Sequence, residues 1–253
     1  MKRTMVMSDI HGELDKMEQL LTKANYRADR DQLILLGDYV DRGPNAKGVI
    51  AKVKELTKEG AIALRGNHED MMIKALTIAN EFWMGRWMRN HAPTTLRPYG
   101  FELPLTEEEA LQQVIRPVSG SNEPPRIIPN KEAPGIKLEL PDQLVEDIRF
   151  LEQLPLYYET EEYIFIHAGV SPTKSLVEMD EQEMIWIREE FHHGYAGEKI
   201  VVFGHTSTNY LHEDGSTDVY FGKNKIIGID GGCVYGGKLH CLELPSRQVY
   251  TIE

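Results

Sequence analysis

LILLGDYVDRGP, residues 33–44, joins an apolar run to a cluster of charges. Residues 33–36 have the composition of a buried β-strand. Asp38, Asp41 and Arg42 follow within six residues of the end of that run. In open α/β sheets, binding sites form beyond the carboxyl ends of the strands. The stretch therefore predicts a core strand that delivers charged side chains to a site.

The same strand–loop–helix unit occurs three times at the start of the chain. Apolar runs predict strands at residues 4–8, 32–36 and 61–64. Each run is followed by a polar loop and by apolar residues at helical spacing, which predicts a largely parallel sheet with covering helices. From residue 156 onward, short apolar runs predict mainly strands. The expected fold class is α/β, with two packed mixed β-sheets (a β-sandwich) flanked by helices.

Residues 80–135 interrupt this alternation of predicted strands and helices. An aromatic cluster that includes Trp83 and Trp87 predicts a helix, and the proline-rich residues 123–135 predict a loop. We predict a single domain over residues 1–253, with a helical and loop insertion at about 80–135. The two tryptophans are typical of core packing, although they could instead wall a substrate groove.

The composition is that of a globular protein, with 41% hydrophobic and 27% charged residues. The net charge of −12 argues against nucleic acid as the main partner, because binding a phosphate backbone requires clustered Lys and Arg. A small phosphorylated substrate remains possible at a locally positive site. Cys233 and Cys241 are the only cysteines, and we expect free buried thiols. With no signal-peptide core and no membrane-length apolar run, we expect a cytoplasmic protein without a membrane partner.

Five of the predicted strands end in loops of one design, each with side chains that can bind metal. The predicted metal ligands are Asp9, His11, Asp38, Asn67, His167 and His205. Taken singly, Asp38 is typical of a turn and His167 of a core histidine. Together the loops indicate a metal centre, because buried carboxylates at several strand ends are costly without cations. Asp9 and His11 could face one ion, Asn67, His167 and His205 a second, with Asp38 bridging both.

The ligand set contains carboxylate, amide and imidazole groups and no thiolate. It suits two divalent transition-metal ions, namely manganese, iron or zinc, with manganese expected to support activity in vitro. Two ions about 3.5–4 Å apart would clamp an in-line displacement at phosphorus and activate a bridging hydroxide as the nucleophile. No side-chain nucleophile is then required.

His68 is the predicted general acid, and Asp41 is predicted to hold the outer nitrogen of its ring. The candidates for binding substrate phosphate are Arg42, Arg188, Arg65 and the metal ligand Asn67. A planar guanidinium grips phosphate oxygens bidentately, which favours Arg42. Arg188 could instead be a solvated helix residue paired with a neighbouring glutamate.

The motifs SDIHG, GDYVDRG, RGNHE, IHAGV and FGHT occur in this order between residues 8 and 206. The set resembles the calcineurin-like metallophosphoesterases, and more closely the bacterial and phage members of the phosphoprotein phosphatase family of serine/threonine phosphatases. The resemblance implies the metallophosphoesterase fold, a binuclear metal centre with the ligands named above, His68 as the acid and phosphate on Arg42. The chain lacks the Ser-Ala-Pro-Asn-Tyr loop of the eukaryotic enzymes.

We therefore expect a metal-dependent phosphomonoester hydrolase, namely a protein-serine/threonine phosphatase that acts on a phosphorylated protein or a small phosphoester. The alternative is a symmetrical bis(5'-nucleosyl)-tetraphosphate hydrolase, which shares the metal site. Members of that group often replace the second aspartate of the GDxVDRG motif, so the presence of Asp41 favours monoester hydrolysis. Trp83, Trp87, Arg97 and Tyr99 could nevertheless provide a dinucleotide groove. A third class, a non-catalytic phosphopeptide reader, is disfavoured by the complete ligand set and by His68.

Overall fold

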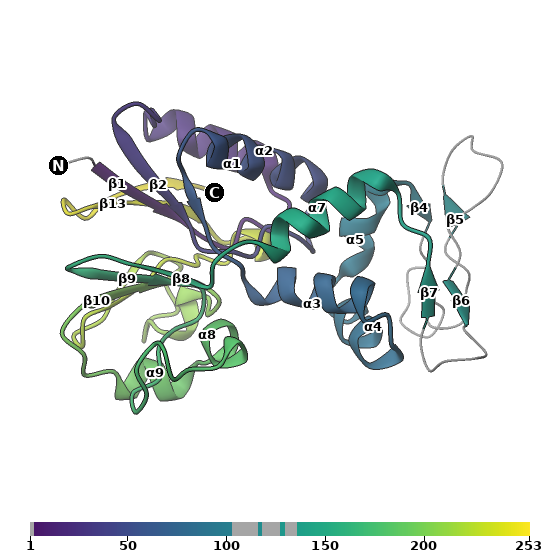
Figure 1. The fold of residues 1–253 in the computed structure, drawn as a ribbon. Coiled ribbons are helices and arrows are strands. Elements are labelled where there is room, and N and C mark those ends of the chain that lie inside the picture. Colours follow the sequence, from purple (N-terminus) through teal and green to yellow (C-terminus); the bar gives the residue numbers. More distant parts are fainter. Residues whose placement is uncertain (1–2, 103–115, 118–126, 130–135) are drawn as a thin grey trace.

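The computed structural model describes residues 3–102, 116–117, 127–129 and 136–253 (Figure 1). Two five-stranded sheets lie at its centre, and helices cover their outer faces. The strand order is β14-β13-β1-β2-β3 in the first sheet and β11-β12-β10-β9-β8 in the second. The prediction of two mixed sheets flanked by helices is confirmed.

The first sheet consists of β1 (Arg3–Met7), β2 (Asp31–Leu35), β3 (Ile62–Ala63), β13 (Leu239–Leu244) and β14 (Gln248–Ile252). The second consists of β8 (Tyr157–Glu159), β9 (Tyr163–Ile166), β10 (Ile200–Phe203), β11 (Tyr220–Phe221) and β12 (Ile226–Gly228). The helices are α1 (Leu14–Lys23), α2 (Ala46–Lys58), α3 (Asn67–Thr77), α4 (Glu81–Met88), α5 (Ala92–Leu96), α7 (Asp142–Glu152), α8 (Glu181–Trp186) and α9 (Glu189–Gly194).

Parallel strands form the middle of both sheets. β1 pairs in parallel with β2 and β2 with β3, while β10 pairs in parallel with both β9 and β12. The carboxyl ends of neighbouring parallel strands lie at the same edge of a sheet, so the loops that follow them are brought together there.

Alternation along the strands divides the apolar side chains between three cores. In β1, Met5 and Met7 pack beneath α1 and α2, whereas Val6 lies between the two sheets. In β9, Phe165 lies between the sheets and Ile164 packs with residues of α8 and α9. Successive side chains of a strand point to opposite faces, so each central strand contributes to two cores. This double burial fixes the register of the strands and hence the positions of the loops at their ends.

The start of the predicted insertion is helical, as expected. It forms α4, α5 and the 3₁₀ helix η1 (Arg97–Tyr99), and its residues Trp87 and Leu96 are buried in the first core. Beyond it, β4 (Phe101–Glu102) pairs with β5 (Arg116–Pro117), and β6 (Ile127–Pro129) with β7 (Ile136–Leu138). Residues 127–129, predicted as loop, are therefore in a strand, while the rest of the proline-rich stretch lies outside the described residues. Both small pairs lie far from the sheets (Figure 1). The single-domain boundary stays a prediction.

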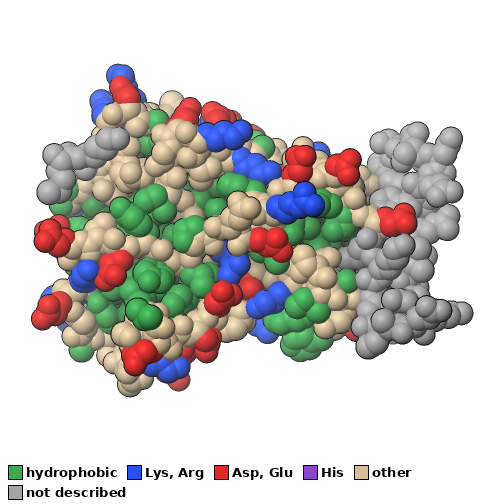
Figure 2. All heavy atoms as spheres, in the orientation of Figure 1, with side chains coloured by type: hydrophobic (Ala, Val, Ile, Leu, Met, Phe, Trp, Pro, Cys, Tyr) green, Lys and Arg blue, Asp and Glu red, His purple; other side chains and the backbone are tan. Residues whose placement is uncertain are grey.

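Within the described ranges, every helix is too short or too polar to cross a bilayer. Figure 2 shows acidic and basic side chains interspersed over one face of the molecule rather than segregated by sign. Cys233 and Cys241 are buried free thiols, as predicted.

Candidate active site

The predicted ligands all lie beyond the carboxyl ends of strands, five of them after central strands and Asn67 after the edge strand β3. Asp9 and His11 follow β1, Asp38 follows β2, His167 follows β9, and His205 follows β10. Asn67 is the first residue of α3, after the short strand β3. All six side chains are buried. The structure thus brings together residues that are up to 196 positions apart in the chain.

The backbone of these loops is strained. Six residues that are not glycine have positive φ angles, namely Asp9 (53°), His11 (43°), Asp38 (57°), Asp41 (69°), Arg42 (69°) and His205 (63°). Such left-handed conformations cost a residue with a Cβ atom roughly 1–2 kcal/mol each. They persist only where the surrounding structure holds them, and they cluster at functional sites.

Glu69 is one of the groups that hold the strained loop after β2. Its Oε2 accepts hydrogen bonds from the backbone N–H of Asp38 at 2.8 Å and of Gly66 at 2.9 Å. Its Oε1 accepts from the N–H of Tyr39 at 2.7 Å and of Val40 at 3.3 Å. The buried carboxylate therefore satisfies four backbone donors and fixes the position of Asp38.

The carboxylate of Asp38 lies between two imidazoles. Its Oδ2 is 3.5 Å from His11 Nε2, and its Oδ1 is 3.4 Å from His167 Nε2. The Nδ1 atoms of these rings face carbonyl oxygens, of Val40 at 2.8 Å and of Leu36 at 2.9 Å, to which they can only donate. In a neutral ring Nε2 then carries a lone pair, so two electron-pair donors face the two oxygens of one carboxylate.

That arrangement calls for positive charge between the facing atoms. A proton on each ring is disfavoured, because burial lowers the pKa of His11 well below its usual value and also lowers the pKa of His167. Burial raises the pKa of Asp38 to about 7 and, together with the charge of Asp38, that of Asp9 to about 6. Bound cations would favour the ionised carboxylates and the neutral rings at once. The donor set therefore fits a pair of metal ions that share Asp38.

The remaining predicted ligands surround this arrangement. Asn67 Oδ1 is 2.8 Å from His167 Nε2 and 2.9 Å from His205 Nδ1. The Nε2 atom of His205 is buried without a hydrogen-bond partner. Asp9 Oδ1 lies 4.0 Å from His11 Nε2, while Asp9 Oδ2 accepts from the backbone N–H of His205 at 3.0 Å. The structure thus gathers all six predicted ligands; their binding of metal stays a prediction.

His68 and Asp41 are in contact, as the sequence suggested. Nδ1 of His68 lies 2.6 Å from Oδ2 of Asp41, and its Nε2 lies 3.9 Å from Oδ2 of Asp38. Asp41 also accepts from the indole N–H of Trp87, 3.0 Å from each carboxylate oxygen, and from the hydroxyl of Thr95 at 2.6 Å. All these groups are buried. The contacts of Trp87 and Thr95 with Asp41 were missed, because only the folded chain brings α4 and α5 against the loop after β2. The sequence predicts Trp87 only as a core residue or as a wall of a substrate groove.

Removing the indole donor should measurably weaken the fold. Trp87→Phe keeps most of the ring volume but leaves the buried carboxylate of Asp41 with one donor fewer. We expect the free energy of unfolding to fall by about 1.5–3 kcal/mol, the usual range for a hydrogen bond to a charged group. Denaturant titration measures this, with the half-buried Trp83→Phe as the matched control. Equal losses in both variants would mean that the bond to Asp41 contributes nothing beyond the lost ring volume.

Two predicted phosphate-binding residues line a cleft of about 390 Å³ beside the predicted metal ligands. Arg42 and Arg188 share this cleft with His205 and Asp230. Arg42 donates to His11 Nε2, and Arg188 donates to the hydroxyl of Thr206 at 2.8 Å. Arg188 therefore lies at the cleft, and neither Glu189 nor Glu190 pairs with it among the described contacts.

Arg65, the other arginine predicted to bind phosphate, lies outside the cleft that Arg42 and Arg188 line. Its Nη2 donates to Glu181 of α8 at 2.9 Å, and its Nη1 to the carbonyl of Glu152 at 3.4 Å. The guanidinium is thus paired with a carboxylate, and Arg65 does not line the cleft.

Asp230 was also missed, although its signal was present. It follows the apolar run that forms β12, in the same way that Asp38 follows β2. Burial and the charge of Asp9 raise its pKa to about 8. Its Oδ1 accepts from the backbone N–H of Gly232 at 2.9 Å. β12 is thus a sixth strand whose end brings a polar side chain, here a carboxylate, to the edge where the predicted ligands lie.

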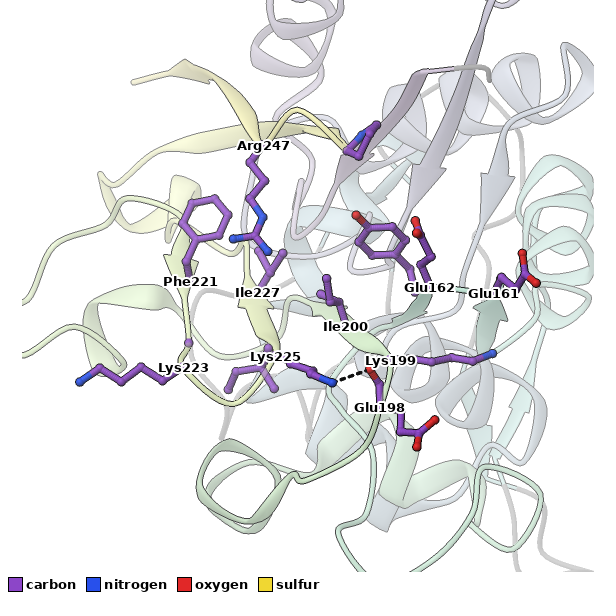
Figure 3. A pocket seen from close by; sticks show the side chains of 14 residues that line it. Glu161, Glu162, Glu198, Lys199, Ile200, Phe221, Lys223, Lys225, Ile227 and Arg247 are labelled. Atoms are coloured by element: carbon purple, nitrogen blue, oxygen red, sulfur yellow. Dashed lines mark hydrogen bonds between the residues drawn. The ribbon is translucent and has the colours of Figure 1, made fainter.

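A larger cavity of about 770 Å³ lies at the opposite edge, where β9, β10 and β12 begin (Figure 3). Its lining includes Ile200, Phe221 and Arg247 but none of the predicted site residues. In Figure 3 the ammonium of Lys225 donates to the carbonyl of Glu198, at 2.9 Å. The convergent polar side chains that chemistry requires are thus at the other end of the sheets.

Several known proteins are similar to this chain over nearly its full length. A symmetrical bis(5'-nucleosyl)-tetraphosphatase of Vibrio parahaemolyticus is 26% identical, covering 98% of this chain and 97% of its own. An asymmetrical bis(5'-nucleosyl)-tetraphosphatase, PrpE of Oceanobacillus iheyensis, is 24% identical, covering 98% and 90%. The crystal structure of a candidate diadenosine tetraphosphatase matches with a TM-score of 0.65 at 20% identity, covering 99% and 93%, which supports the fold alone.

The prediction of a protein-serine/threonine phosphatase is wrong, since these relatives are named as hydrolases of bis(5'-nucleosyl) tetraphosphates. The prediction of a phosphorylated protein as substrate is likewise not supported. The motifs behind that prediction carry the predicted metal-binding and phosphate-binding residues, which do not distinguish one phosphoester substrate from another. Asp41 contacts His68, Trp87 and Thr95, so its presence bears on the acid and not on the substrate.

The family model described as calcineurin-like phosphoesterase matches residues 2–230, which is most of the chain. The match agrees with the two helix-flanked sheets and with the His and Asp groups gathered at their edge. The closer assignment to the phosphoprotein phosphatases is not confirmed. The chain belongs to the calcineurin-like phosphoesterase family and is a metal-dependent hydrolase of phosphoric esters.

Proposed function

We propose that this protein hydrolyses bis(5'-nucleosyl) tetraphosphates symmetrically, to two nucleoside diphosphates. The observation that carries the proposal is the position of Asp38 between two imidazole lone pairs, next to a cleft with two guanidinium groups. The names of the relatives supply the substrate class. We further propose manganese as the activating ion, since carboxylate and imidazole ligands suit it.

Each residue has a role in this proposal. Asp9, His11, Asp38, Asn67, His167 and His205 would hold two divalent ions. The ions, when bound, supply Lewis-acid activation of water and neutralise charge that develops on phosphate. Arg42 and Arg188 bind phosphate oxygens and orient the chain of phosphates in the cleft. His68, held by Asp41, donates a proton to the leaving phosphate oxygen.

A side-by-side assay tests the substrate class. With manganese present, we expect the specificity constant for diadenosine tetraphosphate to exceed that for a phosphoserine peptide by at least about 100-fold, which corresponds to about 3 kcal/mol of transition-state stabilisation. Chromatography of the products should show ADP alone. Equal amounts of ATP and AMP would contradict symmetrical cleavage. A preference for the phosphopeptide would contradict the proposed function as a whole.

A further inference from the structure

Two exposed tyrosines line the cleft that contains the arginines. Tyr210 is 81% exposed and Tyr235 is 68% exposed, and both contribute to the lining beside Arg42 and Arg188. Large aromatic side chains are seldom left this open, and an aromatic wall with a few polar groups is typical of a ligand site. A cleft of about 390 Å³ lies within the usual size range of small-molecule sites.

Tyr235 is held at the cleft by a tightly built loop. It ends the 3₁₀ helix η3 (Cys233–Tyr235), which lies between Gly232 (φ 68°) and Gly236 (φ 82°). At Gly237, a Cβ atom would lie 2.0 Å from the carbonyl oxygen of Gly231, so only glycine fits there. The guanidinium of Arg42 lies 5.2 Å from the centroid of the Tyr235 ring. The loop therefore places an aromatic ring against a predicted phosphate-binding group.

Tyr210 approaches the same cleft from the loop after β10. It ends the 3₁₀ helix η2 (Thr208–Tyr210), five residues beyond the predicted ligand His205. The backbone N–H of Thr208 donates to the carbonyl of Asp230 at 2.8 Å, which ties this loop to the one that carries Tyr235. The Tyr210 phenol has no hydrogen-bond partner within the described parts of the chain. Neither packing nor a hydrogen bond therefore accounts for the exposed position of the Tyr210 side chain.

We propose that Tyr210 and Tyr235 form a nucleoside subsite, on which the base of the substrate stacks while Arg42 and Arg188 hold the adjoining phosphates. This deepens the proposed function and rests on it. Every nucleobase has a π face, and aromatic stacking is tolerant of base identity. The ligand class is a nucleoside 5'-diphosphate group, as a free nucleotide or as half of a dinucleotide. The aromatic residues of the insertion do not serve here, since Trp87 and Tyr99 are buried and neither Phe82 nor Trp83 lines the cleft.

Equilibrium binding to the manganese-loaded protein separates base recognition from phosphate recognition. Calorimetry with ADP and with methyl diphosphate compares two diphosphate monoesters of equal charge that differ in the nucleoside. We expect ADP to bind at least about tenfold more tightly. Tyr210→Ala and Tyr235→Ala should each reduce that ratio by at least about fivefold, since stacking on an aromatic ring is commonly worth that much. Tyr210→Phe and Tyr235→Phe should restore it.

The matched control is Phe82→Ala, which removes an aromatic side chain that is 62% exposed on α4, outside the cleft. It should leave the ratio unchanged. Equal affinity for ADP and methyl diphosphate in the unaltered protein would overturn the subsite. So would a high ratio that neither alanine variant lowers. If diadenosine tetraphosphate is not cleaved but the ratio is high and falls in both variants, the subsite stands and the proposed function fails.

Discussion

His68→Asn is expected to lower the turnover of diadenosine tetraphosphate by about 10²–10⁴-fold, the usual contribution of a general acid. Bound manganese and substrate affinity should change little, because His68 is not among the six predicted ligands and does not line the cleft. Its Nδ1 is fixed by Asp41 at 2.6 Å, so the free Nε2 is the atom that can reach a leaving oxygen. Steady-state kinetics with metal analysis of the same sample measures both quantities.

The groups around Asp41 affect the protonation of the hydrogen-bonded pair His68 and Asp41. Burial, followed by the charge of Arg42, holds the pKa of His68 well below its usual value. Burial also raises the pKa of Asp41 to about 7, whereas the hydrogen bonds from Thr95 and Trp87 act in the opposite direction. These two donors therefore favour the carboxylate form of Asp41, and a carboxylate next to the ring favours the protonated imidazole.

The nature of the leaving group distinguishes loss of an acid from general damage to the site. A proton donor matters most for a basic leaving oxygen and least for an acidic one such as p-nitrophenolate. We therefore expect His68→Asn to slow hydrolysis of phenyl phosphate more than that of p-nitrophenyl phosphate. His193→Asn is the control, since His193 is exposed and pairs with Glu189. Full activity of His68→Asn on all substrates would remove His68 from the mechanism.

The sequence predicted most of the site because the site depends on local rules. A loop after a parallel strand must emerge at one edge of its sheet, so Asp9 and Asp38 meet at the same edge of the first sheet. His167 follows β9 of the second sheet and meets them because the two sheets pack face to face. Asp230 obeys the same rule and could have been found by it. Arg65 also sits beside such a loop, yet its long side chain reaches Glu181 on α8. The direction of a flexible side chain depends on neighbours that a strand pattern does not reveal.

The contacts of the insertion could not be predicted. Trp87 and Thr95 are 46 and 54 residues from Asp41, on helices whose aromatic cluster is equally typical of ordinary core packing. Substrate class was predicted incorrectly for a related reason. The motif residues are the ones predicted to bind ions and one phosphate, whereas the proposed contacts to the rest of the ligand lie outside the motifs, at side chains such as Tyr210.

Asp38→Asn is expected to reduce turnover by at least about 10³-fold, because the two carboxylate oxygens of Asp38 face His11 and His167. An amide has a single acceptor oxygen and no charge, so it cannot replace a bridging carboxylate. We also expect the variant to lose high-affinity manganese binding, measurable by calorimetry. Asp29→Asn is the control, since Asp29 is exposed and paired with Arg27.

The same substitution should stabilise the chelator-treated protein at alkaline pH. The folded pKa of Asp38 is about 7, against an unfolded value of about 3.9, so the folded state binds more protons between these values. The contribution of Asp38 to the stability of the metal-free protein should therefore be complete below about pH 4 and should be lost as the pH rises to about 7. His11 and His167, whose pKa values burial lowers, act in the opposite direction, since their contribution is lost as the pH falls below their unfolded value of about 6.5. Asp9 and Asp230, with pKa values of about 6 and about 8, act in the same direction as Asp38.

Thermal unfolding at pH 5 and pH 8, with and without manganese, tests this reasoning. Metal at 100 times its dissociation constant should raise the midpoint of the unaltered protein at pH 8 by about 5–10 °C. Asp38→Asn should show a smaller loss between pH 5 and pH 8 in chelator and almost no response to manganese. If that variant responded to manganese as the unaltered protein does, Asp38 would not be a shared ligand. If Asp38→Asn and the unaltered protein changed equally in stability between pH 5 and pH 8 in chelator, the buried carboxyl of Asp38 would not be a source of the instability that bound cations relieve.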